Sequence, residues 1–159
     1  MKEGGLSSFH IANCVFNAFL SYTAIMLNSV MIHAIRKTSS LPKTLKTLLL
    51  SLAVSDLGVG LLAQPFFVAR LIIELQNNIE DNPIYVAELI GQTATAILFL
   101  FASLFGVIAL SADRFLAIHF FLSYKELVTH KRVAAVVISI WLFSAFLSLS
   151  SFWIPVNIL

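Results

Sequence analysis

The sequence has little charge for its length. Only 11% of its 159 residues are Asp, Glu, Lys or Arg, whereas about a quarter are charged in an ordinary globular domain. The shortage is concentrated in four segments, because residues 11–35, 89–112 and 133–159 contain no formal charge and residues 47–69 contain only Asp56. A chain this short lacks the polar surface needed to cover four such helices, so an ordinary soluble domain is excluded.

Cysteine is also scarce. The single cysteine, Cys14, lies inside the first apolar segment, so no disulfide can form within the chain. Proline occurs four times, and Pro42 and Pro83 stand where helices are predicted to end or begin. Pro65 interrupts the second segment, where we expect a kink whose freed backbone groups are satisfied by neighbouring helices.

The sequence does contain four apolar segments, each longer than the roughly 20 residues that a helix needs to cross a bilayer. They predict an all-α transmembrane helical bundle with spans at about residues 10–35, 44–75, 83–119 and 130–157. The whole chain, residues 1–159, is then a single membrane domain in contact with the lipid bilayer. Nucleic-acid binding is not expected.

The connections between these segments differ in charge. The loop before the third segment contains Glu80 and Asp81 and no basic residue. The other two connections are basic and contain Arg36, Lys37, Lys43 and Lys46 in the first, and Lys125, Lys131 and Arg132 in the second, beside Arg114. Because short loops rich in Lys and Arg stay in the cytoplasm, we expect the N-terminus outside the cell and both basic connections inside.

Three polar side chains are predicted to share nearly one depth in the membrane. At the helical rise per residue, Asp56 and Ser103 lie about 15 Å, and Asn28 about 12 Å, from the basic end of their segments. A carboxylate, a hydroxyl and an amide suit a small hard cation, which prefers oxygen ligands. The alternative is that these groups join helices through hydrogen bonds, which we favour for Asn28 and Ser103 alone. For Asp56 we favour an ion or proton site, because contact between helices does not require a charge.

A second polar feature is the pair Asp113 and Arg114, which ends the uncharged run of residues 89–112. A guanidinium at the edge of the membrane needs a counter-charge, and an exchange of partners would create a two-state switch. The alternative is an interfacial arginine that extends its head group to water beside a neighbouring acid. From the residues alone the two interpretations are about equal.

Polar residues also lie near the predicted outer ends of the second and third spans. Candidate contacts for an extracellular ligand are Arg70, Glu88, Gln92 and Thr93. Arg70 is four residues before Glu74, and at that helical spacing we first expect the two to form an ion pair. The four histidines lie toward the ends of the spans without the spacing of metal ligands, so an enzyme is not expected.

Each of the four segments contains a recognisable motif. The motifs are LNSVMI with Asn28, SLAVSDLGVGLLAQP with Asp56, SADRFLAIHFFLSY with Asp113 and Arg114, and Trp141 in the fourth segment. In this order, and with the predicted topology, they resemble the rhodopsin-like (class A) G protein-coupled receptors. Each motif alone is weak, but together they are specific, and the resemblance covers nearly the whole chain and four of the family's seven spans.

The resemblance implies a switch at the end of the third span. Asp113 would hold Arg114 in the resting state and release it toward a heterotrimeric G protein on activation. Tyr124 matches the loop tyrosine that steadies the aspartate, and Leu122 matches the apolar residue that many receptors insert into the G protein. The Asp113–Arg114 pair would thus be part of an activation mechanism.

By the same resemblance, Asp56, Ser103 and Asn28 would form half of an allosteric sodium site. Sodium there favours the inactive state, so its effect would be a shift in population. No other cofactor is expected. The complete receptor would lie in the plasma membrane as a multi-pass protein, bind an extracellular ligand and activate G proteins.

Several positions depart from the family pattern. Phe115 replaces the motif tyrosine, Ser51 replaces an asparagine of the second span, and Phe121 replaces a loop proline. Leu89 stands in place of the cysteine that ties the third span to an outer loop. Ala96 stands in place of the aspartate that binds amines, so a biogenic-amine ligand is not expected.

Spans five to seven of the family have no counterpart in these four segments, so we expect a truncated receptor that does not signal alone. An alternative is a four-span membrane protein that interacts with other proteins, or a truncated isoform that pairs with full-length receptors. A third alternative is a transporter that uses Asp56 as its charged site, although the helix breaks and repeats typical of transporters are not found.

Overall fold

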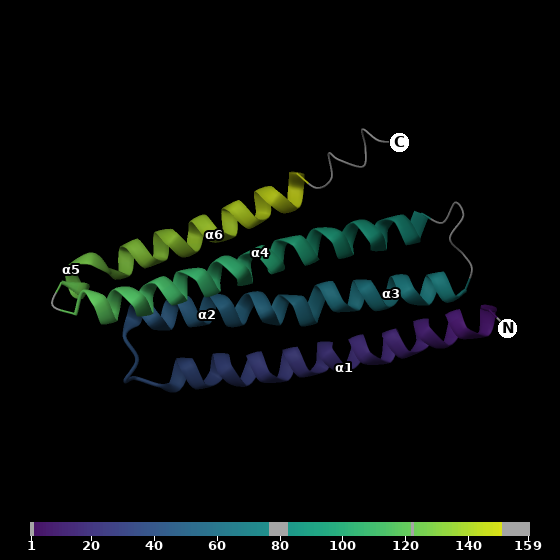
Figure 1. Cartoon of the computed structure of the whole chain (residues 1–159), viewed down its shortest axis with the longest axis horizontal. Coiled ribbons are helices and arrows are strands. Elements are labelled where there is room, and N and C mark those ends of the chain that lie inside the picture. Colours follow the sequence, from purple (N-terminus) through teal and green to yellow (C-terminus); the bar gives the residue numbers. More distant parts are fainter. Residues whose placement is uncertain (1, 77–82, 122, 151–159) are drawn as a thin grey trace.

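The computed structural model describes residues 2–76, 83–121 and 123–150. The helices are α1 (Lys2–Lys37), α2 (Lys43–Gly58), the π-helical segment η1 (Val59–Ala63), α3 (Gln64–Leu75), α4 (Pro83–His119), α5 (Tyr124–Leu127) and α6 (His130–Ser150) (Figure 1). The residues within these described ranges form no β-strand. The predicted all-α fold class is confirmed.

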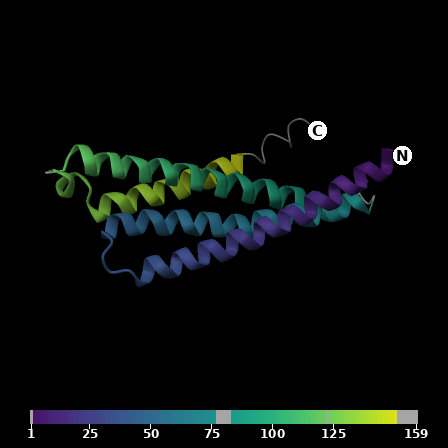
Figure 2. The same ribbon diagram turned by 60° about the horizontal axis from the view of Figure 1, so that its bottom comes forward.

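The helices form four rods that run side by side in alternating directions (Figures 1 and 2). α2, η1 and α3 follow one another without a break and form the second rod, which lies between α1 and α4. The short helix α5 lies where the chain turns from α4 to α6, and the N-terminus lies at the opposite end of the bundle. Four stretches are long and apolar enough to cross a membrane: Ser8–Lys37, Lys43–Leu75, Pro83–His119 and His130–Ser150.

The observed helices differ from the predicted spans in two places, and one predicted boundary cannot be compared. α1 begins at Lys2, before the predicted start near residue 10, because the polar residues at its beginning continue the helix without a break. The predicted end of the fourth span at residue 157 lies outside the described residues. α5 is not predicted from the sequence, because a single turn of four residues has no apolar periodicity.

The second rod supplies much of the buried core. Leu48, Ala53, Ser55 and Leu71 are buried along its length, whereas Ile35 is the one buried residue among the described side chains of α1. Many large apolar side chains on the outward faces of all four rods are exposed. This distribution is typical of helices whose outer faces contact acyl chains and that bury only a narrow strip of side chains against one another.

A π-helical segment precedes Pro65 in the second rod. The amide of Gln64 donates to the carbonyl of Val59, five residues earlier. In this register the carbonyl of Gly60 would pair with the amide of residue 65, but proline has no N–H. Ser21 of α1 supplies the missing donor, since its Oγ lies 2.7 Å from the Gly60 carbonyl oxygen. The second rod thus leaves α-helical geometry just before Pro65, and a neighbouring helix satisfies the freed carbonyl as predicted.

A contact between two rings joins α2, α4 and α6. Phe99 meets Trp141 edge-on, with the ring centroids 6.2 Å apart and an interplanar angle of 84°. The indole nitrogen of Trp141 also donates to Ser51 Oγ at 3.0 Å. Phe99 is buried directly over Gly58, where an added Cβ would lie 2.3 Å from the ring. Glycine is therefore required at this position for α4 to approach α2.

Replacing Gly58 with alanine is expected to destabilise the bundle. The methyl group would displace the buried Phe99 ring, and such overpacking costs about 1–3 kcal/mol, which outweighs the ~1 kcal/mol that alanine gains over glycine in a helix. Gly106→Ala is the matched control, because the nearest atom to an added Cβ there belongs to Leu52 and is 3.5 Å away. Thermal unfolding in detergent, followed by circular dichroism, should give the lower midpoint for Gly58→Ala. Equal midpoints for the two variants would contradict this packing.

Candidate functional site

At the α5 end of the bundle, two polar side chains meet one buried carboxylate. Asp113 of α4 is only 3% exposed. Its Oδ2 accepts a hydrogen bond from Arg114 Nε at 3.1 Å and also contacts Nη2 of the same guanidinium. Its Oδ1 accepts a 2.6 Å hydrogen bond from the hydroxyl of Tyr124. The structure thus brings together the three residues that the sequence places in the switch.

Helix α5 holds Tyr124 beside Asp113. The carbonyl oxygens of Glu126 and Leu127 accept hydrogen bonds from Arg132 Nη1 at 3.2 and 2.9 Å, respectively. The last carbonyls of a helix have no hydrogen-bond donor within the helix, and a basic side chain such as that of Arg132 can supply one. Sequence reasoning assigns Arg132 only to a basic loop and misses this role. A basic residue shortly after a potential helical turn is the sequence feature that could have revealed it.

The two charges of the pair have different environments. The side chain of Arg114 is 46% exposed, whereas that of Asp113 is 3% exposed. An exposed guanidinium loses little hydration energy in the pair, but a buried carboxylate without partners would be strongly penalised. Tyr124 leaves Asp113 with one hydrogen bond when the guanidinium departs. The geometry therefore allows Arg114 to change partners while Asp113 stays in place.

A second carboxylate lies near the middle of the bundle. Asp56 Oδ1 accepts a 2.8 Å hydrogen bond from Ser103 Oγ, which joins α2 to α4. Both residues line a recess of about 390 Å³ that also includes Gln64 and Gln92. The amide oxygens Oε1 of these two glutamines are buried without a hydrogen-bond partner. The recess thus presents several oxygen atoms, the ligand type that hard cations prefer.

Asn28 does not join this pair. Its side-chain amide donates to the carbonyl of Ala24 on its own helix at 2.9 Å, and it does not line the recess. Among the described residues, no group of three or more His, Cys, Asp or Glu side chains could hold a metal ion. A cation in the recess would therefore depend on Asp56 and on neutral oxygens.

The candidate ligand residues at the opposite end separate into different environments. Arg70 forms the expected ion pair with Glu74, with 3.8 Å between Nε and Oε1, and also lies over the Phe67 ring. Thr93 is exposed and donates to the carbonyl of Leu89 in its own helix. Glu88, which is not among the residues lining the recess, has a buried Oε2 atom without a hydrogen-bond partner. Of the four candidate residues, Gln92 is the one that lines the recess containing Asp56.

Leu122, the predicted apolar contact with the G protein, lies outside the described residues. Two described apolar residues nearby are strongly exposed, since Ile118 is 83% and Phe121 82% exposed. The α5 end therefore presents apolar side chains as well as the Arg114 guanidinium on its surface.

The four long apolar helices and these two carboxylate sites indicate an integral membrane protein with several spans and an ion pair at one end. Residues 27–156 match the family described as 7 transmembrane receptor (rhodopsin family), and the chain belongs to this family. It is a multi-pass plasma-membrane protein of this receptor family.

Relatives within this family include adenosine and adrenergic receptors. The chain is 30% identical to the adenosine receptor A2b of Gallus gallus, 28% to the alpha-2B adrenergic receptor of Cavia porcellus and 26% to the adenosine receptor A3 of Ovis aries. The matches cover 86%, 82% and 80% of this chain but 38%, 28% and 38% of the respective relatives. The chain thus spans well under half the length of these relatives.

The pKa of Tyr124 provides a test of the Asp113 cluster. Burial raises the pKa of its phenol above the usual value, and the hydrogen bond to Asp113 raises it further, while Thr44 and Arg114 act in the opposite direction. The folded state therefore favours the neutral phenol. Its contribution to stability is present below the unfolded-state pKa of about 10 and is lost as pH rises through the higher folded-state pKa.

Tyr124→Phe is expected to remove one phenol from the highest-pH phase of an ultraviolet difference titration and to weaken the loss of stability above pH ~10. Asp113→Asn should lower the pKa of Tyr124 only in part, because burial of the phenol remains. An unchanged titration after Tyr124→Phe would show that Tyr124 does not ionise in this range and would contradict the assignment.

Proposed function

We propose that the four helices are the first four of a class A G protein-coupled receptor, with the N-terminus outside the cell. The complete receptor binds an extracellular ligand and activates heterotrimeric G proteins. The observation that best supports this proposal is the cluster in which Asp113 binds both Arg114 and Tyr124. The basic residues at the α5 end, among them Lys131 and Arg132, support a cytoplasmic location for that end.

In the proposed mechanism, Arg114 is the moving part of the switch. In the resting state its guanidinium is paired with Asp113, as in the structure. On activation it turns away from the bundle and donates hydrogen bonds to acceptors on the G protein, for which the planar guanidinium has five N–H groups. Asp113 remains bonded to Tyr124, so the carboxylate is not left without a partner. Leu122 is proposed to contact the G protein beside Arg114.

We also propose an allosteric sodium site at Asp56. The carboxylate and Ser103 Oγ would bind the ion, and the unpartnered Oε1 of Gln92 lies in the same recess. A bound sodium ion would supply the positive charge that this carboxylate lacks. Asn28 contributes only after its side chain leaves the carbonyl of Ala24, to which it is now bonded.

The proposed ligand region includes Gln92, with Glu88, Thr93 and Arg70 as neighbours at the same end. Ala96 lines the recess at the position where the family resemblance places the amine-binding aspartate. The absence of a carboxylate there supports a ligand other than a biogenic amine, in spite of the match to an adrenergic receptor.

We propose further that the 159-residue chain alone does not activate G proteins, because the cleft that receives the G protein needs further helices. A second candidate function is a membrane protein that pairs with full-length receptors. The large apolar side chains exposed on every rod favour helix pairing in the membrane and give this alternative its support.

Completion of the bundle tests the receptor function. The chain is co-expressed with a segment that supplies three further helices from the adenosine receptor A2b of Gallus gallus, and nucleotide exchange on the G protein is measured. We expect exchange only when both segments are present. Arg114→Gln should reduce it by about tenfold or more, since hydrogen bonds to a charged group contribute about 1.5–3 kcal/mol. Lys131→Gln, a neighbouring exposed charge, is the control.

Two outcomes of this experiment count against the proposal. Surface expression of both segments without any exchange would contradict the receptor function and favour the pairing protein. Exchange that is equally reduced by Arg114→Gln and Lys131→Gln would show that general positive charge, rather than the switch, is responsible.

Sodium binding is tested on the chain itself. At constant ionic strength, replacement of potassium by sodium should raise the thermal midpoint, and a sodium concentration tenfold above Kd corresponds to about 1.4 kcal/mol of stabilisation. Asp56→Asn should abolish the difference between the two cations. Glu74→Gln removes a carboxylate outside the recess and should retain it. A sodium effect that persists in Asp56→Asn would place the ion elsewhere.

A further inference from the structure

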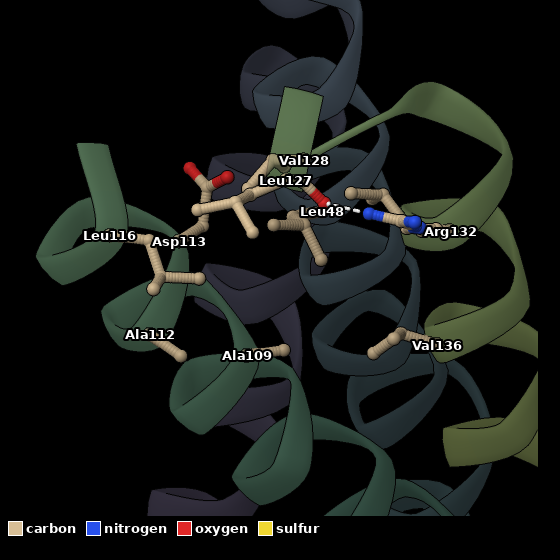
Figure 3. Close-up of a pocket in the computed structure, with 10 residues that line it drawn as sticks. Leu48, Ala109, Ala112, Asp113, Leu116, Leu127, Val128, Arg132 and Val136 are labelled. Carbon is tan, nitrogen blue, oxygen red and sulfur yellow. Dashed lines mark hydrogen bonds between the residues drawn. The ribbon is translucent and has the colours of Figure 1, made fainter. Parts of the chain in front are cut away.

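An apolar cavity lies at the α5 end, apart from the recess that contains Asp56. Its volume is about 220 Å³, and its walls come from α2, α4, α5 and α6. Ala109 and Ala112 of α4 leave space opposite Val136 of α6, and Figure 3 shows Ala109 and Val136 facing each other across it. The short side chains of Ala109 and Ala112 thus leave part of the space between α4 and α6 unfilled.

The cavity continues to the surface of the bundle. Val136 is 46% and Leu127 43% exposed, and Ala112 is exposed as well. These positions belong to stretches long and apolar enough to cross a membrane, or lie next to them. In a bilayer, such an opening is in contact with lipids. An acyl chain is therefore the ligand whose apolar character fits the apolar lining of the cavity.

One cation lies at the rim of the cavity. Arg132 uses Nη1 to bond the carbonyls of Glu126 and Leu127, as Figure 3 shows for Leu127. The Nε and Nη2 groups of Arg132 make no hydrogen bond to the described residues. No Asp or Glu among the described residues forms an ion pair with Arg132. A guanidinium edge with free N–H groups matches the two oxygens of a carboxylate.

The negative charge of Asp113, which also lines the cavity, does not oppose an anion at Arg132. Its carboxylate is paired with Arg114 and bonded to Tyr124. In Figure 3 it points away from Ala109 and Ala112, so it lies outside the path of an acyl chain.

We propose that this cavity binds a long-chain fatty acid, with the carboxylate on Arg132 and the chain between Ala112 and Val136. The apolar cavity suits the acyl chain of a fatty acid, and the single cation at its rim, Arg132, suits the carboxylate. The bound chain would pack beneath Leu127 and thereby hold α5, which positions Tyr124 on Asp113. The proposal concerns lipid binding and does not depend on whether the chain signals.

The test uses the full chain in nanodiscs of phosphatidylcholine and a fatty acid with a photoreactive diazirine near the end of its chain. Labelled peptides are located by mass spectrometry. We expect labelling concentrated in residues 109–116 and 133–136. Arg132→Gln should reduce it by about tenfold, as expected for loss of hydrogen bonds to a charged group. Lys131→Gln, which removes an exposed charge outside the cavity, should change it by no more than about twofold.

A second variant keeps the test informative if Arg132→Gln disturbs α5. Ala112→Phe fills the cavity without removing Arg132 and should abolish the concentrated labelling, whereas Ala12→Phe adds the same ring to an exposed face of α1 and should retain it. Labelling spread over all four rods would overturn the proposal. Equal labelling in Arg132→Gln and Lys131→Gln, or better labelling by a photoreactive phosphatidylserine, would also overturn it.

Discussion

The buried carboxylate of Asp113 is the constraint on which the α5 end of the protein depends. A charged group at 3% exposure needs partners, and it receives them from two different elements. Arg114 follows it directly on α4, whereas Tyr124 is delivered by α5. Because Arg132 of α6 caps α5, the partners of one carboxylate tie α4, α5 and α6 into a unit. If Arg114 leaves, Tyr124 keeps one hydrogen bond on the carboxylate, but the negative charge of Asp113 then has no paired cation.

Elsewhere the rods are joined by small and polar residues more than by large apolar ones. This is the expected arrangement where the surroundings are as apolar as the side chains, because burial of apolar surface then gives little driving force between helices. The helices are instead held together by van der Waals contact between closely approaching backbones and by hydrogen bonds between helices. Within the membrane-spanning stretches, hydrogen bonds that connect different rods include those from Ser21 to Gly60, from Ser103 to Asp56, from Trp141 to Ser51 and from Ser148 to Ala94.

The sequence predicts those features that depend on one helix or on spacing along it. The four apolar rods follow from length and hydropathy, and the Arg70–Glu74 pair follows from a four-residue spacing. Contacts between rods are predicted only where a depth or a freed backbone group points to them, as for Ser103 with Asp56 and for the carbonyl freed at Pro65. In the sequence, Ser51 is recognised only as a departure from the family pattern. In the structure it accepts a hydrogen bond from Trp141, ninety positions later in the chain. Asn28 is placed at the correct depth, but depth does not show that its amide turns to Ala24.

The two carboxylates within the rods differ in how their charge is balanced, and this difference bears on their roles. Asp113 has a fixed cation, Arg114, and a phenol. Asp56 has the neutral hydroxyl of Ser103, and no basic side chain of the described residues pairs with it. A half-buried carboxylate with only a neutral donor keeps an uncompensated charge, which is costly away from water. At the proposed sodium site a bound cation would supply the positive charge that Asp56 lacks, whereas Asp113 is paired with the guanidinium of Arg114. The proposed sodium site thus lies at the carboxylate that has no cationic side chain as a partner, and the proposed switch lies at the carboxylate whose partner, Arg114, is 46% exposed.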